Sequence, residues 1–124
     1  MKIINKVEKL KSNGHYALAL VDNNRIYVSG QFSFDPKTGE KKFGSMEEEI
    51  KQVLFNIDLI LKEAGSSKNK ILKVVVYIND LDQWHSVDKT YSEFFSEHTP
   101  ARTILALPKL HFGFKVEIDV IAAC

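Results

Sequence analysis

The chain has 124 residues, of which 44% are hydrophobic and 27% are charged, as in an ordinary globular protein. This length fits a single domain, residues 1–124, with enough apolar side chains for a core that needs no disulfide. Seventeen basic and sixteen acidic residues leave a formal charge of +1, so no concentrated basic surface points to a nucleic acid as partner.

The beginning of the chain carries no export or membrane signal. Residues 1–9 mix lysines with apolar residues and lack the apolar core of a secretory signal. No apolar run reaches the ~20 residues of a membrane-spanning helix. The only cysteine, Cys124, excludes an internal disulfide and a multi-cysteine metal site, and the four histidines show no ligand spacing. We therefore expect a cytoplasmic protein that binds neither a membrane nor a metal.

The first predicted element is a β-hairpin. Residues 16–21 and 25–34 are rich in β-branched and aromatic side chains, and Asp22-Asn23-Asn24 between them supplies residues that favour a tight turn. A second turn is predicted at residues 35–39, where a proline presets φ and a glycine accepts an unusual one.

A helix is predicted to begin at Ser45. Ser45 and Glu48, three residues later, have the spacing of a capping box, and Gly65 is placed to end the helix. Apolar residues between them recur at helical spacing: Ile50, Val53, Leu54, Ile57, Leu61 and Ala64.

A strand and a second helix follow. Residues 71–78 form a nearly continuous apolar run, as expected of a central strand covered on both faces. The next helix is predicted to be capped by Asp80 or Asp82 and to be ended by Pro100. Its inward-facing residues are predicted to be Trp84, Val87, Tyr91, Phe94 and Phe95.

Two C-terminal strands, residues 103–107 and 115–123, complete the order β-β-α-β-α-β-β, with residues 103–107 expected to be buried. Right-handed crossovers would put both helices on one face of the sheet. The last strand is nevertheless apolar on both sides, with Val116 on one and Ile121 on the other, whereas a bare sheet face should be polar. We therefore expect the bare face to be buried against other copies in a symmetric oligomer.

The candidate site centres on Arg102, at the mouth of a predicted strand. A guanidinium there can hold a planar carboxylate with two parallel hydrogen bonds. Glu117 and Asp119 share one face of the last strand, and the strand register could bring Glu117 to the ligand of Arg102. A lone arginine at a strand end is more often a surface residue or an ion-pair partner, so the residues alone leave both interpretations open.

Several stretches, in order and over nearly the whole chain, resemble the Rid family, the reactive-intermediate deaminases also called YjgF proteins. The four main ones are Gly14-His15-Tyr16, Val28-Ser29-Gly30-Gln31, Pro100-Ala101-Arg102-Thr103 and Val116-Glu117-Ile118-Asp119. Residues 35–39, 63–65 and 91–95 also match in order and spacing.

This resemblance implies a chorismate-mutase-like α+β fold of the bacillus type and a homotrimer with three clefts between subunits. It implies hydrolysis of 2-imino and enamine acids, such as 2-iminobutanoate and 2-aminoacrylate, to 2-oxo acids and ammonia, without a cofactor. By position, Arg102 would grip the substrate carboxylate and Glu117 would position or activate water. Tyr16 and Ser29 would line the cleft and donate or accept hydrogen bonds, and Ile104, two residues after Arg102, would also contact the substrate.

The chain departs from the family pattern at three positions in or near these stretches. Ile104 stands where many members have a cysteine, His15 precedes Tyr16 where Gly-Pro-Tyr is common, and Asp88 stands where asparagine is frequent. An extra carboxylate near the cleft would repel an anionic substrate. The two phenylalanines of residues 107–114 are expected to make the pocket more apolar.

Other interpretations of these residues stay open. Tyr16 could be an amphipathic strand residue, Ser29-Gly30 could form a bulge, and Glu117 could pair with Lys115 or Arg102 for structure alone. At the level of function, the alternatives are a non-catalytic regulatory protein that binds a small ligand, and an endoribonuclease or translation inhibitor. The charge balance argues against the last of these.

Overall fold

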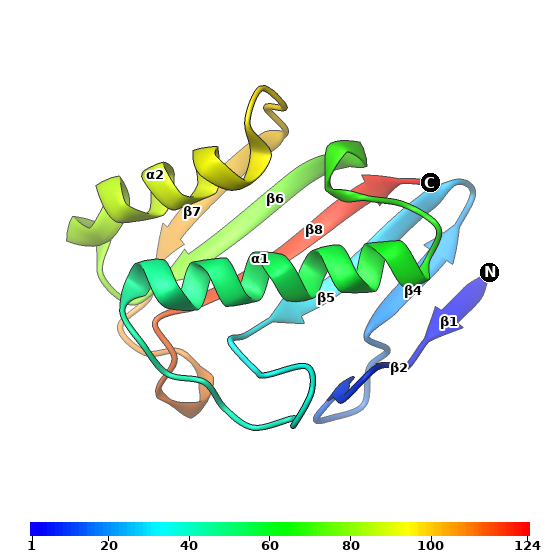
Figure 1. The fold of residues 1–124 in the computed structure, drawn as a ribbon, viewed down its shortest axis with the longest axis horizontal. Coiled ribbons are helices and arrows are strands. Elements are labelled where there is room, and N and C mark those ends of the chain that lie inside the picture. Colours follow the sequence, from blue (N-terminus) through cyan, green and yellow to red (C-terminus); the bar gives the residue numbers. More distant parts are fainter.

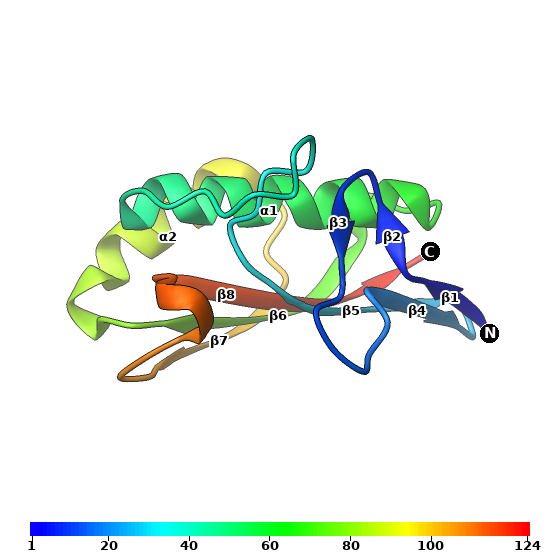
Figure 2. The ribbon, with the colours of Figure 1, turned by 90° about the horizontal axis from the view of Figure 1, so that it is seen from below.

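A six-stranded mixed sheet carries both helices on one face (Figures 1 and 2). The computed structural model describes residues 1–124. The strand order is β1-β4-β5-β8-β6-β7, and only the β6–β7 pair is parallel. The strands are β1 (Lys2–Ile4), β4 (Ala19–Asp22), β5 (Arg25–Gln31), β6 (Ile71–Ile78), β7 (Ala101–Ala106) and β8 (Val116–Ala123). A separate small hairpin pairs β2 (Lys6–Val7) with β3 (Leu10–Lys11).

The predicted hairpin is confirmed as the antiparallel pair β4–β5. Asn23 and Asn24 form its turn with φ of 47° and 64°, the left-handed values that a two-residue hairpin turn needs and that asparagine tolerates. The strand β4 begins at Ala19, so the expectation that Tyr16 lies in this strand is wrong. In β5, the register against β8 shifts between Val28 and Gln31.

Helix α1 (Met46–Glu63) begins and ends as predicted. The Ser45 hydroxyl accepts from the backbone N–H of Glu48 at 3.2 Å, and the Glu48 carboxylate accepts from the N–H of Ser45 at 3.0 Å. Gly65 follows the helix with φ of +83°, a left-handed conformation that suits glycine. The face toward the sheet is fully buried at Ile50, Val53, Leu54, Ile57 and Leu61.

Helix α2 (Trp84–Phe95) differs from its prediction at both ends. Asp80 caps only the preceding 3-10 turn, Leu81–Gln83, and α2 has no side-chain cap. The helix ends at Phe95, where Ser96 has φ of 55°, well before Pro100. Of the predicted inward residues, Val87, Tyr91 and Phe95 are buried and Phe94 is half-buried, but Trp84 is 39% exposed.

The core lies between the sheet and the two helices. In β8, Val116, Ile118 and Val120 are buried under the helices, whereas Ile121 is half-buried on the bare face, so the two-sided apolar pattern is confirmed. Strand β7 lies at the sheet edge with one neighbour, which leaves Leu105 46% exposed. The expectation of a buried strand here is therefore wrong for the single chain. Neither helix has the length and apolar character required to cross a membrane.

Candidate active site

The largest hollow lies on the sheet face away from the helices, beside the register shift of β5. It has a volume of about 840 Å³ and is lined by Tyr16, Ser29, Gly30, Phe112, Glu117 and Asp119 among others. Two loops border it, the connection from β3 to β4 and the one from β7 to β8, and Figure 2 shows both on the side of the sheet opposite the helices. The position follows from strand alternation, because Glu117 and Asp119 alternate in β8 with residues buried beneath the helices.

Glu117 extends across the backbone of β5 at Gly30. A β-carbon built at Gly30 would lie 2.9 Å from Cδ of Glu117 and 3.2 Å from its Cγ, so only glycine leaves room for this carboxylate. Burial raises the pKa of Glu117; His111 nearby lowers it and Asp119 raises it further. A carboxylate with a raised pKa is a stronger base than an ordinary one, which suits it to take a proton from water.

Ser29 and Tyr16 have complementary hydrogen-bonding capacity. The Ser29 hydroxyl donates to the carbonyl of Ala17 at 2.7 Å, so toward a ligand it can only accept. The Tyr16 hydroxyl accepts from the backbone N–H of Asn13 at 3.2 Å, which leaves its own proton for a ligand. Three of the predicted site residues, Tyr16, Ser29 and Glu117, therefore share one hollow.

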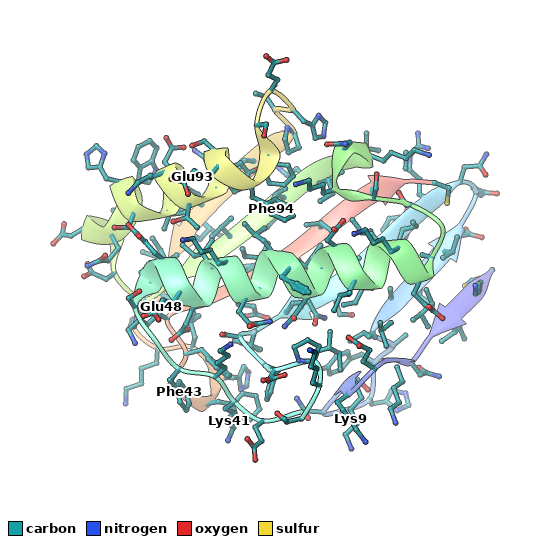
Figure 3. The ribbon with its side chains drawn as sticks, viewed as in Figure 1. Lys9, Lys41, Phe43, Glu48, Glu93 and Phe94 are labelled. Carbon is teal, nitrogen blue, oxygen red and sulfur yellow. The ribbon has the colours of Figure 1, made fainter.

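An aromatic wall closes one side of the hollow. Phe112 has φ of 63°, which is unusual for a bulky side chain, and its ring lies edge-on to Phe32 with centroids 5.9 Å apart. The ammonium of Lys41, on the loop before α1 (Figure 3), lies 4.8 Å from the centroid of Phe112. Phe114, by contrast, is 1% exposed and stacks on Phe32. Of the two phenylalanines expected at the pocket, only Phe112 lines it.

Sequence reasoning missed other members of this hollow, among them Asn13, Phe32 and His111. The spacing of the histidines, which excludes a metal-ligand pattern, gives no sign of a role for His111. The available signal was its place in the loop that leads directly into the strand of Glu117. Phe32 had no such signal, because it reaches the hollow through the irregular segment after β5.

Arg102 lies elsewhere, in a second hollow of about 390 Å³ between α2 and β7. Its partner in the parallel register is Val74, a buried residue beneath the helices, so Arg102 faces the helices too. Its Nη1 donates to Oδ1 of Asp88 at 2.9 Å, and its Cζ lies 4.7 Å from the ring centroid of Tyr91. Ile104 faces the same side and packs against the core.

Arg102 and Glu117 thus point to opposite faces of the sheet, and the strand register does not bring them together within one chain. The interpretation of Arg102 as an ion-pair partner is correct for the single chain, with Asp88 as the partner. The structural pairing considered for Glu117 is wrong, because Glu117 takes part in no ion pair and Lys115 pairs with Glu49 at 3.5 Å.

The chemistry that the larger hollow can supply is that of a basic carboxylate between hydrogen-bonding groups. Glu117 can accept a proton, and the Tyr16 hydroxyl can donate a hydrogen bond. No group of three or more histidine, cysteine or acidic side chains in the chain is arranged to hold a metal ion.

Comparison with known proteins gives one consistent result. The family model described as "Endoribonuclease L-PSP" matches residues 6–124. A RutC family protein of Pyrococcus abyssi is 40% identical over 90% of this chain and 88% of its own. A 2-iminobutanoate/2-iminopropanoate deaminase of Bos taurus is 36% identical over 98% of this chain and 88% of its own. The crystal structure of E. coli TdcF with bound serine is similar with a TM-score of 0.91 and 29% identity, over 100% of this chain and 99% of that one.

Proposed function

The chain belongs to the YjgF/Rid family, and from this premise we propose that it hydrolyses 2-imino and enamine acids to 2-oxo acids and ammonia. The observation that carries the proposal is Glu117, a half-buried carboxylate with a raised pKa in the largest hollow of the molecule. The deaminase name of the bovine relative supports the reaction class. The serine bound to E. coli TdcF supports a ligand of amino-acid size.

The proposed reaction requires little beyond positioning, because the carbon of an imine is already electrophilic. Glu117 takes a proton from water as the water oxygen attacks the carbon of the protonated imine, which gives a neutral tetrahedral amino alcohol. The protonated Glu117 then gives this proton to the amino nitrogen. As the C–N bond breaks, the hydroxyl proton passes back to Glu117, the carbonyl forms, and ammonia leaves. Tyr16 donates a hydrogen bond to the substrate, and Ser29 accepts one from the attacking water or from nitrogen.

We place the other end of the substrate on Arg102 of a neighbouring subunit. Within one chain the side chains of Arg102 and Glu117 point to opposite faces of the sheet, so one small acid cannot contact both. A homotrimer with clefts between subunits would bring the hollow of one chain to the Arg102 of the next. Two features support it: the open edge of β7, and exposed apolar residues on the bare face such as Tyr27 and Leu105.

The test is a coupled assay in which a threonine dehydratase generates 2-iminobutanoate and the release of 2-oxobutanoate is followed. The protein should accelerate release, and Glu117→Gln should remove most of the acceleration, because the amide keeps the shape of the side chain but is a far poorer base. Binding of 2-oxobutanoate should change little in this variant. Equal rates with and without the wild-type protein would refute deamination of this substrate.

A ligand-binding role without turnover is the second candidate. The serine bound to E. coli TdcF favours it, because serine is neither an imine nor an enamine and is held there as a ligand. A protein of this kind would bind 2-oxobutanoate but leave the release rate unchanged. The endoribonuclease activity in the family's description has no comparable support here, since the formal charge is only +1.

A further inference from the structure

Asp88 stands beside the residue proposed to bind the substrate carboxylate. The pair joins α2 to β7 through a single hydrogen bond, from Nη1 of Arg102 to Oδ1 of Asp88 at 2.9 Å. The guanidinium has other N–H groups that are free to bind a ligand, and Oδ2 of Asp88 is likewise free. The side chain of Asp88 is 45% exposed and that of Arg102 is 22% exposed, so a ligand can reach both.

The surroundings hold this pair in place. The guanidinium lies over the ring of Tyr91, which is 7% exposed and whose hydroxyl is buried without a partner. His98, in the same hollow, is engaged with the carbonyl of Ile71 at 2.7 Å. Asp88 is the only acidic residue that lines this hollow. Its carboxylate therefore determines which charge is accepted next to Arg102.

A carboxylate bound to Arg102 would stand next to that of Asp88, and two carboxylates on one guanidinium leave a net negative charge. A 2-oxo acid carries nothing to offset this charge. A protonated imine or an ammonium group on the carbon next to the carboxylate carries a positive charge. Its N–H groups can donate hydrogen bonds to Oδ2 of Asp88.

We propose that Asp88 makes the carboxylate-binding end of the site selective for zwitterionic 2-iminium and 2-amino acids over 2-oxo acids. The inference rests on the function proposed above, in which Arg102 binds the substrate carboxylate. It adds a consequence for turnover: hydrolysis removes the cationic nitrogen, so the product loses its interaction with Asp88 and is released by the repulsion that remains.

The test compares two probes, L-serine as zwitterion and 2-oxobutanoate as simple anion, by isothermal titration. Asp88→Asn keeps the shape of the side chain and an oxygen that can accept from Arg102 but removes the charge. It should tighten binding of 2-oxobutanoate about tenfold and weaken that of serine, the scale expected for one lost charge interaction in a partly exposed site. Asp82→Asn is the matched control, because it removes the same charge at an exposed position ahead of α2. In this variant each dissociation constant should stay within about twofold of the wild-type value.

An unchanged ratio of the two dissociation constants in folded Asp88→Asn would overturn the proposal. An equal tightening for both probes would overturn it too, since Asp88 would then only compete for Arg102. Arg102→Ala separates this failure from failure of the proposed site. If that variant binds neither probe and Asp88→Asn leaves the ratio unchanged, the carboxylate site stands and only its selectivity is refuted. If Arg102→Ala binds both probes normally, the site itself is wrong.

Discussion

Gly30→Ala should disable catalysis by moving Glu117 rather than by removing it. The added methyl carbon would lie 2.9 Å from Cδ and 3.2 Å from Cγ of Glu117, whereas carbon atoms in contact are separated by about 3.5–4.0 Å. The carboxylate must therefore move by roughly 1 Å. A misplacement of about 1 Å can cost about 100-fold in rate, or about 2.7 kcal/mol in the activation free energy. We expect a loss of that size in kcat.

The coupled assay measures this loss. Titration with 2-oxobutanoate serves as its control, because the proposed carboxylate contact is Arg102 of the neighbouring subunit, whereas the atoms nearest to a β-carbon at Gly30 all belong to Glu117. The decisive measurement is Gly30→Ala in a Glu117→Ala background. With the carboxylate absent, the methyl group has nothing to displace, so it should cost little further activity. Wild-type turnover in folded Gly30→Ala would refute the reasoning, and so would an undiminished loss in the double variant.

The same geometry makes the arginine, the assembly and the pH dependence testable. Arg102→Lys should weaken 2-oxobutanoate binding and lower turnover together, because lysine keeps the charge but loses the planar fork. Arg102→Ala should cost about 2–5 kcal/mol of binding free energy while the assembly persists. Undiminished affinity for 2-oxobutanoate in a folded Arg102→Ala variant would rule out this site. Light scattering should give a mass near three times the 14.1 kDa of one chain, and a stable monomer at micromolar concentration would remove the cleft between subunits. Turnover should fall as the pH falls through the raised pKa of Glu117, because the protonated carboxyl group cannot accept a proton. Asp119→Asn should move this loss of turnover to lower pH, because Asp119 raises the pKa of Glu117. An unchanged pH profile in Asp119→Asn would contradict the assignment of Glu117 as the base.

Local signals predicted the parts of the fold that neighbouring residues determine. The paired asparagines at Asn23 and Asn24 marked the hairpin turn, and the spacing of Ser45 and Glu48 marked the start of α1, because each motif satisfies its own backbone groups. The alternation in β8 correctly placed Glu117 and Asp119 together on one face, which in the structure is the bare face. Each of these features is contained within a few residues of sequence.

The sheet order and the direction of Arg102 could not be predicted in this way. They depend on the pairing of β7 with β6, segments separated by the whole of α2, and no local pattern specifies that register. The error at Trp84 has a related cause, because helical spacing marks a face but not how far the sheet beneath it extends. β7 is the last strand on that side, and Trp84 is 39% exposed near Arg102.

Side-chain alternation explains why a second subunit is required by the proposed chemistry. Arg102 and Ile104 share the helix side of β7, and Glu117 and Asp119 share the opposite side of β8. A shift of one residue in either strand would bring the arginine and the glutamate to one face, but it would also turn the buried residues of that strand toward solvent. The core therefore fixes the two groups on opposite faces. Under the proposed reaction the substrate contacts both groups and must lie between two copies, so the proposal predicts a catalytic as well as a structural role for the bare apolar face.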